Sequence, residues 1–286
     1  MNADALLSGI SIGLLISFVA LGFALTFSVL KFINFAHSDL LTVGAYLTYL
    51  CTRTFGLNIL FGAAIAIAAT GLLGALIERF AFRPLRNQRL SMFVSSFGVS
   101  LVLNAVITLC FGSSSRLLSS YAGTVQAGPV RLTYVELWAF LTFAALFLLI
   151  AYTLQRTQYG LAIRAVAENW DGVALLGIPC DRLVSITFFV SSSLAATAGI
   201  MLAMMSGLTP QMGQRYGIWA FAIVVVAGLG NILGIPITGL LTGVVIAAVM
   251  ATFGSYTYVN VALFGIMSLV LLTRPEGIFG LRLRRI

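Results

Sequence analysis

The chain has 286 residues, of which 60% are hydrophobic and 8% are charged, and its formal net charge is +8. A soluble domain carries about 25% charged residues, so this composition excludes an ordinary water-facing surface and matches a protein whose solvent is lipid. The positive charge does not indicate nucleic-acid binding, because the arginines cluster between apolar segments, where they set membrane topology.

Apolar segments in chain order predict an all-α, polytopic membrane protein with eight or nine transmembrane helices. The first segment is long enough to span a bilayer and too long for the core of a cleaved signal. The second and seventh are short for a straight crossing. If the second re-enters the membrane instead of crossing it, the count is eight. The predicted helices cover residues 6–30, 39–51, 57–77, 92–111, 134–154, 184–206, 218–230, 235–252 and 259–273.

Arginine placement orients these helices. Four arginines lie in residues 78–89, three in residues 155–182 and four in the tail after residue 273. Because Lys and Arg are retained on the cytoplasmic side, all three segments are predicted to be cytoplasmic. Nine crossings then place the N-terminus outside, and eight place it inside. A single membrane domain is predicted to cover residues 1–286.

Several kinds of chemistry are disfavoured. Lys31 is the only lysine, and no Gly-rich loop ends in Gly-Lys-Ser/Thr, so the chain is not predicted to bind or hydrolyse a nucleotide. One histidine and three scattered cysteines make no metal site. The eight acidic residues fall mostly at membrane edges and in loops, which disfavours a proton relay. A passive channel remains, as does a transporter driven by other subunits.

The stretch "INFAHSDLLTVGAY" (residues 33–46) places Asn34, His37 and Asp39 between two apolar segments. One interpretation is a turn at the membrane edge, in which Asn34 caps the next helix and the other two side chains meet water. The other is a helix broken within the membrane. Non-helical backbone is tolerated at that depth only inside protein or beside water, so a broken helix indicates a translocation pathway.

The stretch "YGLAIRAVAENWDGVALLGIPCDRL" (residues 159–183) lies in a predicted cytoplasmic loop. Its spacing predicts one helix over about 161–176, preceded by Gly160 and ended by Gly177 and Pro179. Periodicity alone also fits a helix lying on the membrane surface. However, alanines such as Ala165 offer little apolar depth for lipid and favour close packing against another protein.

Three stretches of the sequence resemble the motifs of one known family. "RAVAENWDGVALLGI" resembles the EAA-type coupling motif of ABC importer permeases, in the form found in the branched-chain amino-acid permease family. "INFAHSDLLTVGAY" resembles that family's N-terminal signature, and "LTRPEGIFG" (residues 272–280) resembles its C-terminal ending. The order of the motifs and the chain length resemble the H-type subunit. Ser38 and Trp219 depart from the family pattern, which usually has Gly and often has Lys at these positions.

The resemblance implies an ABC importer permease fold and a subunit that translocates branched-chain or related amino acids across the bacterial inner membrane. It implies these partners: a second, related permease, two cytoplasmic ATPases that bind ATP and Mg²⁺, and a periplasmic binding protein. It implies a cytoplasmic coupling helix at about 160–178. The residues predicted to couple to the ATPases are Gly160, Arg164, Ala165, Glu168, Asn169 and Gly177. Those predicted to line the pathway are Asn34, His37, Asp39 and Gly44.

Two alternatives remain open at the level of sequence. Permeases for urea, short amides or another small polar solute share these motifs. A self-sufficient channel or ion-coupled carrier would need no ATPase partner. Neither alternative, nor the main interpretation, requires enzymatic activity or a cofactor in this chain.

Overall fold

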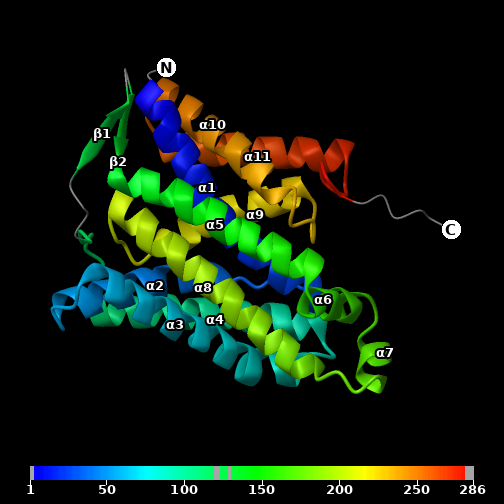
Figure 1. Ribbon diagram of the computed structural model, residues 1–286. Helices are drawn as coiled ribbons and strands as arrows, with labels where there is room; N and C mark the ends of the chain where they lie inside the picture. The colour runs from blue at the N-terminus through cyan, green and yellow to red at the C-terminus, as the bar shows by residue number, and fades with distance from the viewer. Residues whose placement is uncertain (1–2, 119–122, 128–129, 281–286) are drawn as a thin grey trace.

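The computed structural model describes residues 3–118, 123–127 and 130–280, and it is almost entirely helical (Figure 1). The long helices are α1 (Ala3–Leu30), α2 (Ala36–Arg53), α3 (Ile59–Ile77), α4 (Arg89–Phe111), α5 (Tyr134–Arg156), α8 (Cys180–Ser206), α9 (Met212–Ala227), α10 (Ile235–Phe253) and α11 (Tyr256–Thr273). The short helices are the π-helix η1 (Glu78–Phe82), the 3-10 helix η2 (Arg83–Leu85), α6 (Gln158–Glu168) and α7 (Trp170–Leu175).

Each of the nine predicted segments corresponds to one of the long helices. Seven helices in the described part of the chain are long and apolar enough to cross a membrane. The exceptions are α2 and α9, the two segments that were short in the sequence. α9 starts six residues earlier than predicted, because Met212, Gly213, Tyr216 and Gly217 of its first turns pack inside the protein although polar residues interrupt the apolar pattern there.

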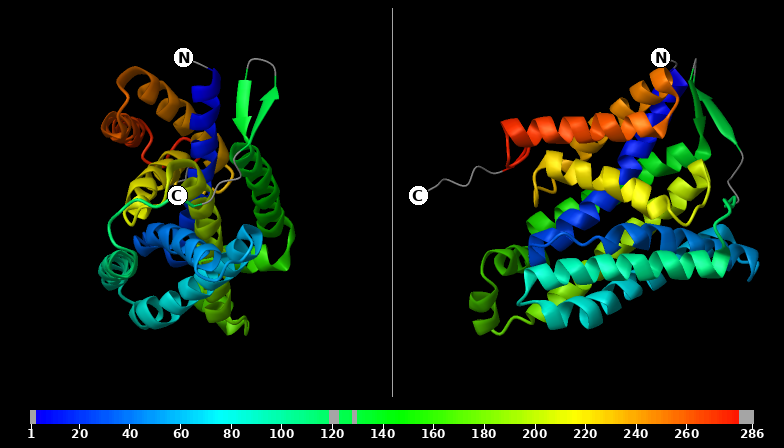
Figure 2. Two further views of the ribbon diagram at one scale, coloured as in Figure 1. Left: turned by 90° about the vertical axis from the view of Figure 1, so that its left-hand side faces the viewer. Right: turned by 180° about the vertical axis from the view of Figure 1, so that it is seen from behind.

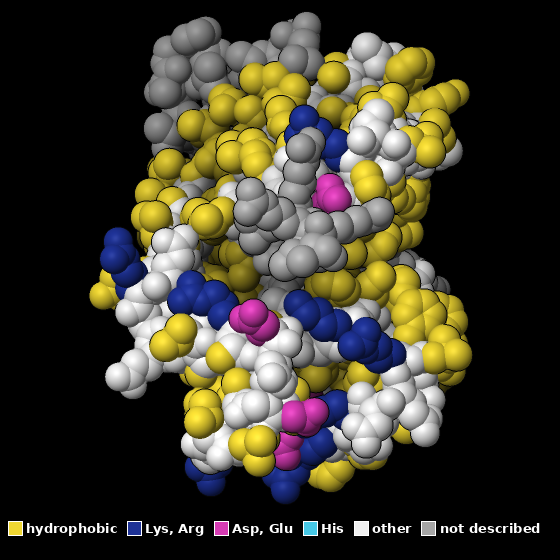
Figure 3. Space-filling view, turned by 90° about the vertical axis from the view of Figure 1, so that its right-hand side faces the viewer, with side chains coloured by type: hydrophobic (Ala, Val, Ile, Leu, Met, Phe, Trp, Pro, Cys, Tyr) yellow, Lys and Arg dark blue, Asp and Glu magenta, His cyan; other side chains and the backbone are white. Residues whose placement is uncertain are grey.

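The bundle has two chemically different ends. The start of α1 lies at one end, beside an antiparallel hairpin of β1 (Thr124–Ala127) and β2 (Val130–Thr133) that the sequence did not predict (Figures 1 and 2). The opposite end carries α6, α7 and the segment after α11. Charged side chains gather on that end (Figure 3). Arg274 lies in the segment after α11 at this end of the bundle, whereas the other three tail arginines lie outside the described residues.

The nine-helix alternative agrees with this arrangement. α1 and α11 run so that the start of the first and the end of the last lie at opposite ends of the bundle (Figure 2). α2 connects the inner part of the bundle to the end that carries the hairpin, so it does not return to the side it came from (Figure 1).

The interior is held together by close contacts between small residues. The α1 and α10 helices cross where Gly9 and Gly13 meet Gly239 and Gly243. A Cβ added at Gly243 would lie 2.6 Å from the carbonyl oxygen of Gly9. This atom belongs to the backbone of α1, so it cannot move aside as the end of a flexible side chain could. The small-x-x-x-small pattern of α10 thus marks a real helix contact, as such patterns do in membrane proteins.

We expect Gly243→Ala to lower the thermal stability of the purified protein in detergent. Overpacking a tight site costs about 1–3 kcal/mol, which exceeds the helix-propensity gain of about 0.5–1 kcal/mol for replacing glycine by alanine. Gly265→Ala in α11 is the matched control, because nothing lies within 4 Å of its added Cβ. The control should be neutral or stabilising. If both variants melt alike, the α1–α10 contact contributes no measurable stability.

Candidate functional site

The helical path breaks between α1 and α2. α1 ends at Leu30, and Lys31 has a left-handed backbone with φ of +54°. Residues 31–35 then lead back into the bundle, because the ring nitrogen Nε2 of His37 lies 3.2 Å from the carbonyl oxygen of Val19. At 1.5 Å per residue, Val19 is about 16 Å from the end of α1. A hydrocarbon core is about 30 Å thick, so α2 begins near its middle.

The interpretation of this stretch as a water-facing turn is wrong. Phe35 occupies the N-cap of α2, and no side chain caps that end of the helix. Asn34, His37 and Asp39 are 2%, 0% and 1% exposed, so none of them meets bulk water. The geometry agrees with a helix broken inside the membrane.

The buried polar groups at this break are incompletely hydrogen-bonded. Ser100 of α4 donates to one carboxylate oxygen of Asp39. Three atoms have no hydrogen-bond partner among the described residues: Oδ1 of Asn34, Nδ1 of His37 and Oδ1 of Asp39. Buried polar atoms are normally paired, so this cluster has capacity for a solute, water or another subunit. Its role in a pathway stays a prediction.

α9 supplies the other side of this cluster. The backbone N–H of Gly213 donates to the hydroxyl of Thr42 at 2.8 Å. A Cβ at Gly213 would lie 2.6 Å from the carbonyl oxygen of Ser38, and one at Gly217 would collide with the Ser38 side chain. The starts of the two short helices therefore meet inside the protein. The signal in the sequence was the glycine pair four residues apart, which lay before the segment predicted as apolar.

Gly44 and Trp219 belong to helix contacts. A Cβ at Gly44 would lie 2.5 Å from that of Ala196, so Gly44 sits where α2 crosses α8 and not among the unpaired polar atoms. The buried Trp219 donates its indole N–H to Asn260 of α11 at 2.6 Å. Both residues position helices around the break.

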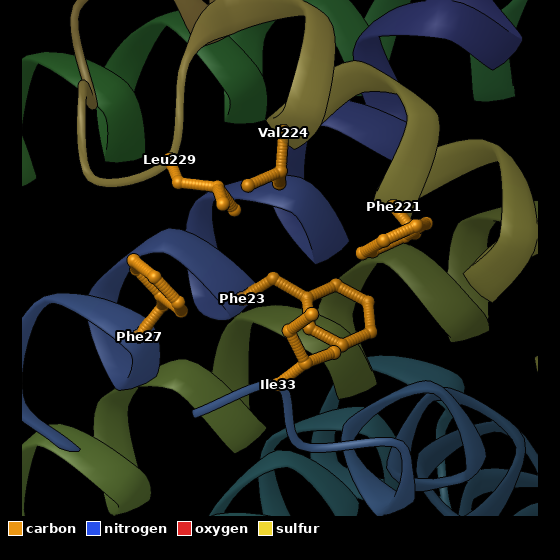
Figure 4. A pocket seen from close by; sticks show the side chains of 6 residues that line it. All are labelled: Phe23, Phe27, Ile33, Phe221, Val224 and Leu229. Carbon is orange, nitrogen blue, oxygen red and sulfur yellow. The ribbon is translucent and has the colours of Figure 1, made fainter. Parts of the chain in front are cut away.

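A small apolar hollow lies beside the returning segment. Ile33 forms part of its wall, one residue before the buried Asn34. Figure 4 shows side chains of α1 on one side and of α9 on the other. The segment thus carries an apolar wall next to a polar cluster. The hollow is lined by Phe23, Phe27, Ile33, Phe221, Val224 and Leu229.

The predicted coupling helix is two helices. Asn169 is extended, with φ of −147° and ψ of 96°, and separates α6 from α7. Its side chain accepts a hydrogen bond from the N–H of Gly172 at 3.0 Å, so it caps α7. The single-helix prediction was wrong because periodicity does not reveal that an asparagine acts as a cap. Gly177 ends the unit with φ of +77°, a conformation that favours glycine.

The six predicted coupling residues do not share one surface. Arg164, Glu168, Asn169 and Gly177 are exposed. Ala165 is half-buried and packs against the hydrophobic cluster formed at this end of the chain. Gly160 is buried in the turn after α5, where a Cβ would collide with the backbone of Leu154. Gly160 and Ala165 therefore face the chain's own interior, whereas Gly177 is free to meet a partner.

Three leucines that the sequence did not single out are exposed on the α6–α7 unit. Leu161, Leu175 and Leu176 are 61%, 89% and 78% exposed. α6 follows the end of α5, and α7 projects from the same end of the bundle (Figure 1). Apolar groups of this kind beside polar ones mark interaction sites. The signal was the apolar pair directly before Gly177.

The C-terminal motif lies at the end of the bundle that carries α6 and α7 (Figure 1). The N–H groups of Ile278 and Phe279 donate to the carbonyl oxygens of Val226 and Ala227 at 2.8 and 3.1 Å. Asn231, in the loop after α9, donates to the carbonyl oxygen of Phe279. The motif after residue 272 therefore closes over the end of α9.

In the described residues, no group of three or more His, Cys, Asp or Glu side chains is placed to hold a metal ion.

The chain matches a known protein family over most of its length. The family described as "Branched-chain amino acid transport system / permease component" matches residues 5–272. The chain is 32% identical to the high-affinity branched-chain amino acid transport system permease protein BraD of Pseudomonas aeruginosa, covering 96% of this chain and 94% of BraD. It is 31% identical to the permease protein LivH of Escherichia coli, again over 96% and 94% of the two chains.

Among solved structures, PsaBC from Streptococcus pneumoniae has a similar fold. The TM-score is 0.53 at 15% sequence identity, and the superposition covers 96% of this chain and 91% of the other. The similarity concerns the course of the helices along nearly the whole chain.

Proposed function

Since the chain belongs to the family of branched-chain amino acid transport system permease components, we propose that it carries branched-chain or related amino acids across the bacterial inner membrane. It does so as one membrane-spanning subunit of an ABC importer. Its partners are a second, related permease, two cytoplasmic ATPases and a periplasmic binding protein. ATP and Mg²⁺ bind to the ATPases, because this chain has a single lysine and no phosphate-binding loop.

The observation that carries the proposal is the α6–α7 unit. It stands outside the spanning helices at the charged end of the bundle (Figures 1 and 3) and presents exposed leucines beside Arg164, Glu168 and Asn169. An importer powered by separate ATPases needs a rigid cytoplasmic element to receive their movement. The exposed surface of this unit has the mixed apolar and charged character of a protein contact.

The break before α2 supports the amino-acid substrate. A zwitterion needs hydrogen-bond acceptors for its ammonium group, and Asn34 and Asp39 have buried oxygens with free capacity. A branched aliphatic side chain needs an apolar surface, which the hollow beside Ile33 offers. Cluster and hollow lie on the same returning segment.

The proposal is tested by reconstituting the complete complex in liposomes and measuring uptake of radiolabelled solutes. We expect ATP-dependent accumulation of leucine, isoleucine and valine in the presence of the cognate binding protein. Accumulation of urea or acetamide without branched-chain amino acids would favour the small-amide alternative. Uphill uptake by this chain alone, driven by a proton or sodium gradient, would make it a carrier.

A further inference from the structure

A network of charges at the inner end of the bundle is not used by the function proposed above. Its centre is Glu78, the first residue of η1, whose side chain is completely buried. Arg83 and Arg86 each place a guanidinium nitrogen 3.0 Å from a Glu78 carboxylate oxygen. The hydroxyl of Ser185 on α8 donates to the same carboxylate at 2.6 Å. A buried carboxylate is costly unless it is paired in this way.

The π-helical turn makes the pairing possible. Its backbone bond runs from the N–H of Arg83 to the carbonyl oxygen of Glu78, five residues earlier. In an α-helix, residues five apart point about 140° away from each other. The wider turn brings both side chains to one face. Such turns often occur at functional sites.

The network ties two membrane helices together. Asp181, in the first turn of α8, lies 2.5 Å from Arg86 and 3.6 Å from Arg83. The two arginines thus sit between one carboxylate at the end of α3 and another at the start of α8. These helices pack against each other further inside the membrane, where a Cβ at Gly71 would lie 2.9 Å from the ring of Phe189.

Trp170 adds the cytoplasmic unit to this network. The guanidinium carbon of Arg86 lies 4.3 Å from the centre of the Trp170 ring, within the range of a cation–π interaction. Trp170 is the first residue of α7, and its half-buried ring belongs to the inner hydrophobic cluster. α7 is otherwise bounded by non-helical joints, the extended Asn169 before it and Gly177 after it. The Trp170 ring and the buried Val173 therefore join α7 to the inner part of the chain, and Trp170 is the one that contacts Arg86.

We propose that Arg86 is the positioning residue that carries the movement of α7 into α3 and α8, with Trp170 as its contact on α7 and Glu78 and Asp181 as its contacts on the membrane helices. The inference rests on the proposed function, because it assigns the route by which the ATPases act on the membrane part. An arginine suits this role. Its planar group stacks on an aromatic ring while its N–H groups hold carboxylates on either side, whereas a lysine ammonium cannot do both.

The experiment uses the complete reconstituted complex and compares Trp170→Ala, Arg86→Lys and the matched control Trp170→Phe. Three quantities are measured: ATPase stoichiometry after purification, unstimulated ATP hydrolysis, and leucine transported per ATP hydrolysed. We expect Trp170→Ala and Arg86→Lys to keep the first two and to lower the third roughly tenfold, the size of effect expected for losing a partly desolvated cation–π contact. Trp170→Phe, which keeps a ring, should stay close to the wild type.

The double variant Arg86→Lys/Trp170→Ala should transport as much leucine per ATP as the more impaired of the two single variants. Both changes remove the same contact, so their effects do not add. The inference is overturned if the single variants transport as much leucine per ATP as the wild type, or if Trp170→Phe is as impaired as Trp170→Ala. These outcomes presuppose a wild-type complex that accumulates leucine with ATP. A wild-type complex that does not would refute the proposed function instead.

Discussion

The Leu176→Glu variant is expected to lose its ATPase subunits while its membrane part stays folded. Leu176 follows α7 and is 78% exposed outside the spanning helices. If this surface seats in an ATPase, the new carboxylate is buried without a partner, which costs about 3–5 kcal/mol. That cost corresponds to a loss of roughly two to four orders of magnitude in affinity. The measurement is the amount of ATPase that co-purifies with the permease, together with the ATP hydrolysis of the product.

The matched control is Leu117→Glu. Leu117 has the same exposed fraction of 78% but lies shortly before the β1–β2 hairpin in the sequence, away from the α6–α7 unit. The same substitution there should therefore leave ATPase stoichiometry unchanged. Full stoichiometry in Leu176→Glu would instead show that the α6–α7 unit lies on the membrane surface. A bulky residue at Ala165 does not distinguish these cases, because Ala165 packs against its own chain.

Asp39→Asn is expected to reduce amino-acid uptake by the reconstituted complex while assembly and unstimulated ATP hydrolysis survive. The substitution keeps the shape of the side chain and removes its charge. A hydrogen bond to a charged group is worth about 1.5–3 kcal/mol, so losing one to a substrate ammonium group lowers uptake by roughly 10- to 150-fold. Initial rates of leucine uptake at saturating ATP measure this effect.

Ser100→Ala separates substrate binding from packing. It removes the hydroxyl that donates to Asp39 but leaves the carboxylate in place. The carboxylate remains available to a substrate ammonium group, so we expect a smaller loss of uptake than for Asp39→Asn. Wild-type uptake in Asp39→Asn would mean that Asp39 serves only as an acceptor inside the protein and that the pathway lies elsewhere.

Much of the fold follows from local sequence. Lipid imposes one rule along the whole chain, namely that backbone groups bond within their own helix, so each apolar segment such as Ile59–Ile77 is recognisable without its neighbours. Charge placement is equally local, and the arginine-rich segment at 78–89 lies at the same end of the bundle as α6 and α7. The hairpin Thr124–Thr133 was missed because two four-residue strands leave little periodic signal.

The site was only half predictable. Asn34, His37 and Asp39 stood out because polar groups are rare between apolar segments. The sequence left open whether they face water or the interior. That question depends on where α1 ends relative to α2, and it is decided by a contact between His37 and Val19.

The sequence by itself determined the class of protein, its helices and its family, because composition, hydropathy and motifs are properties of short segments read one at a time. Only the tertiary structure decided that α2 starts deep within the bundle, that Asn169 separates α6 from α7 and that Arg86 lies between Trp170, Glu78 and Asp181. These features join residues up to about a hundred positions apart. Their energies depend on distance and burial, which no local pattern encodes.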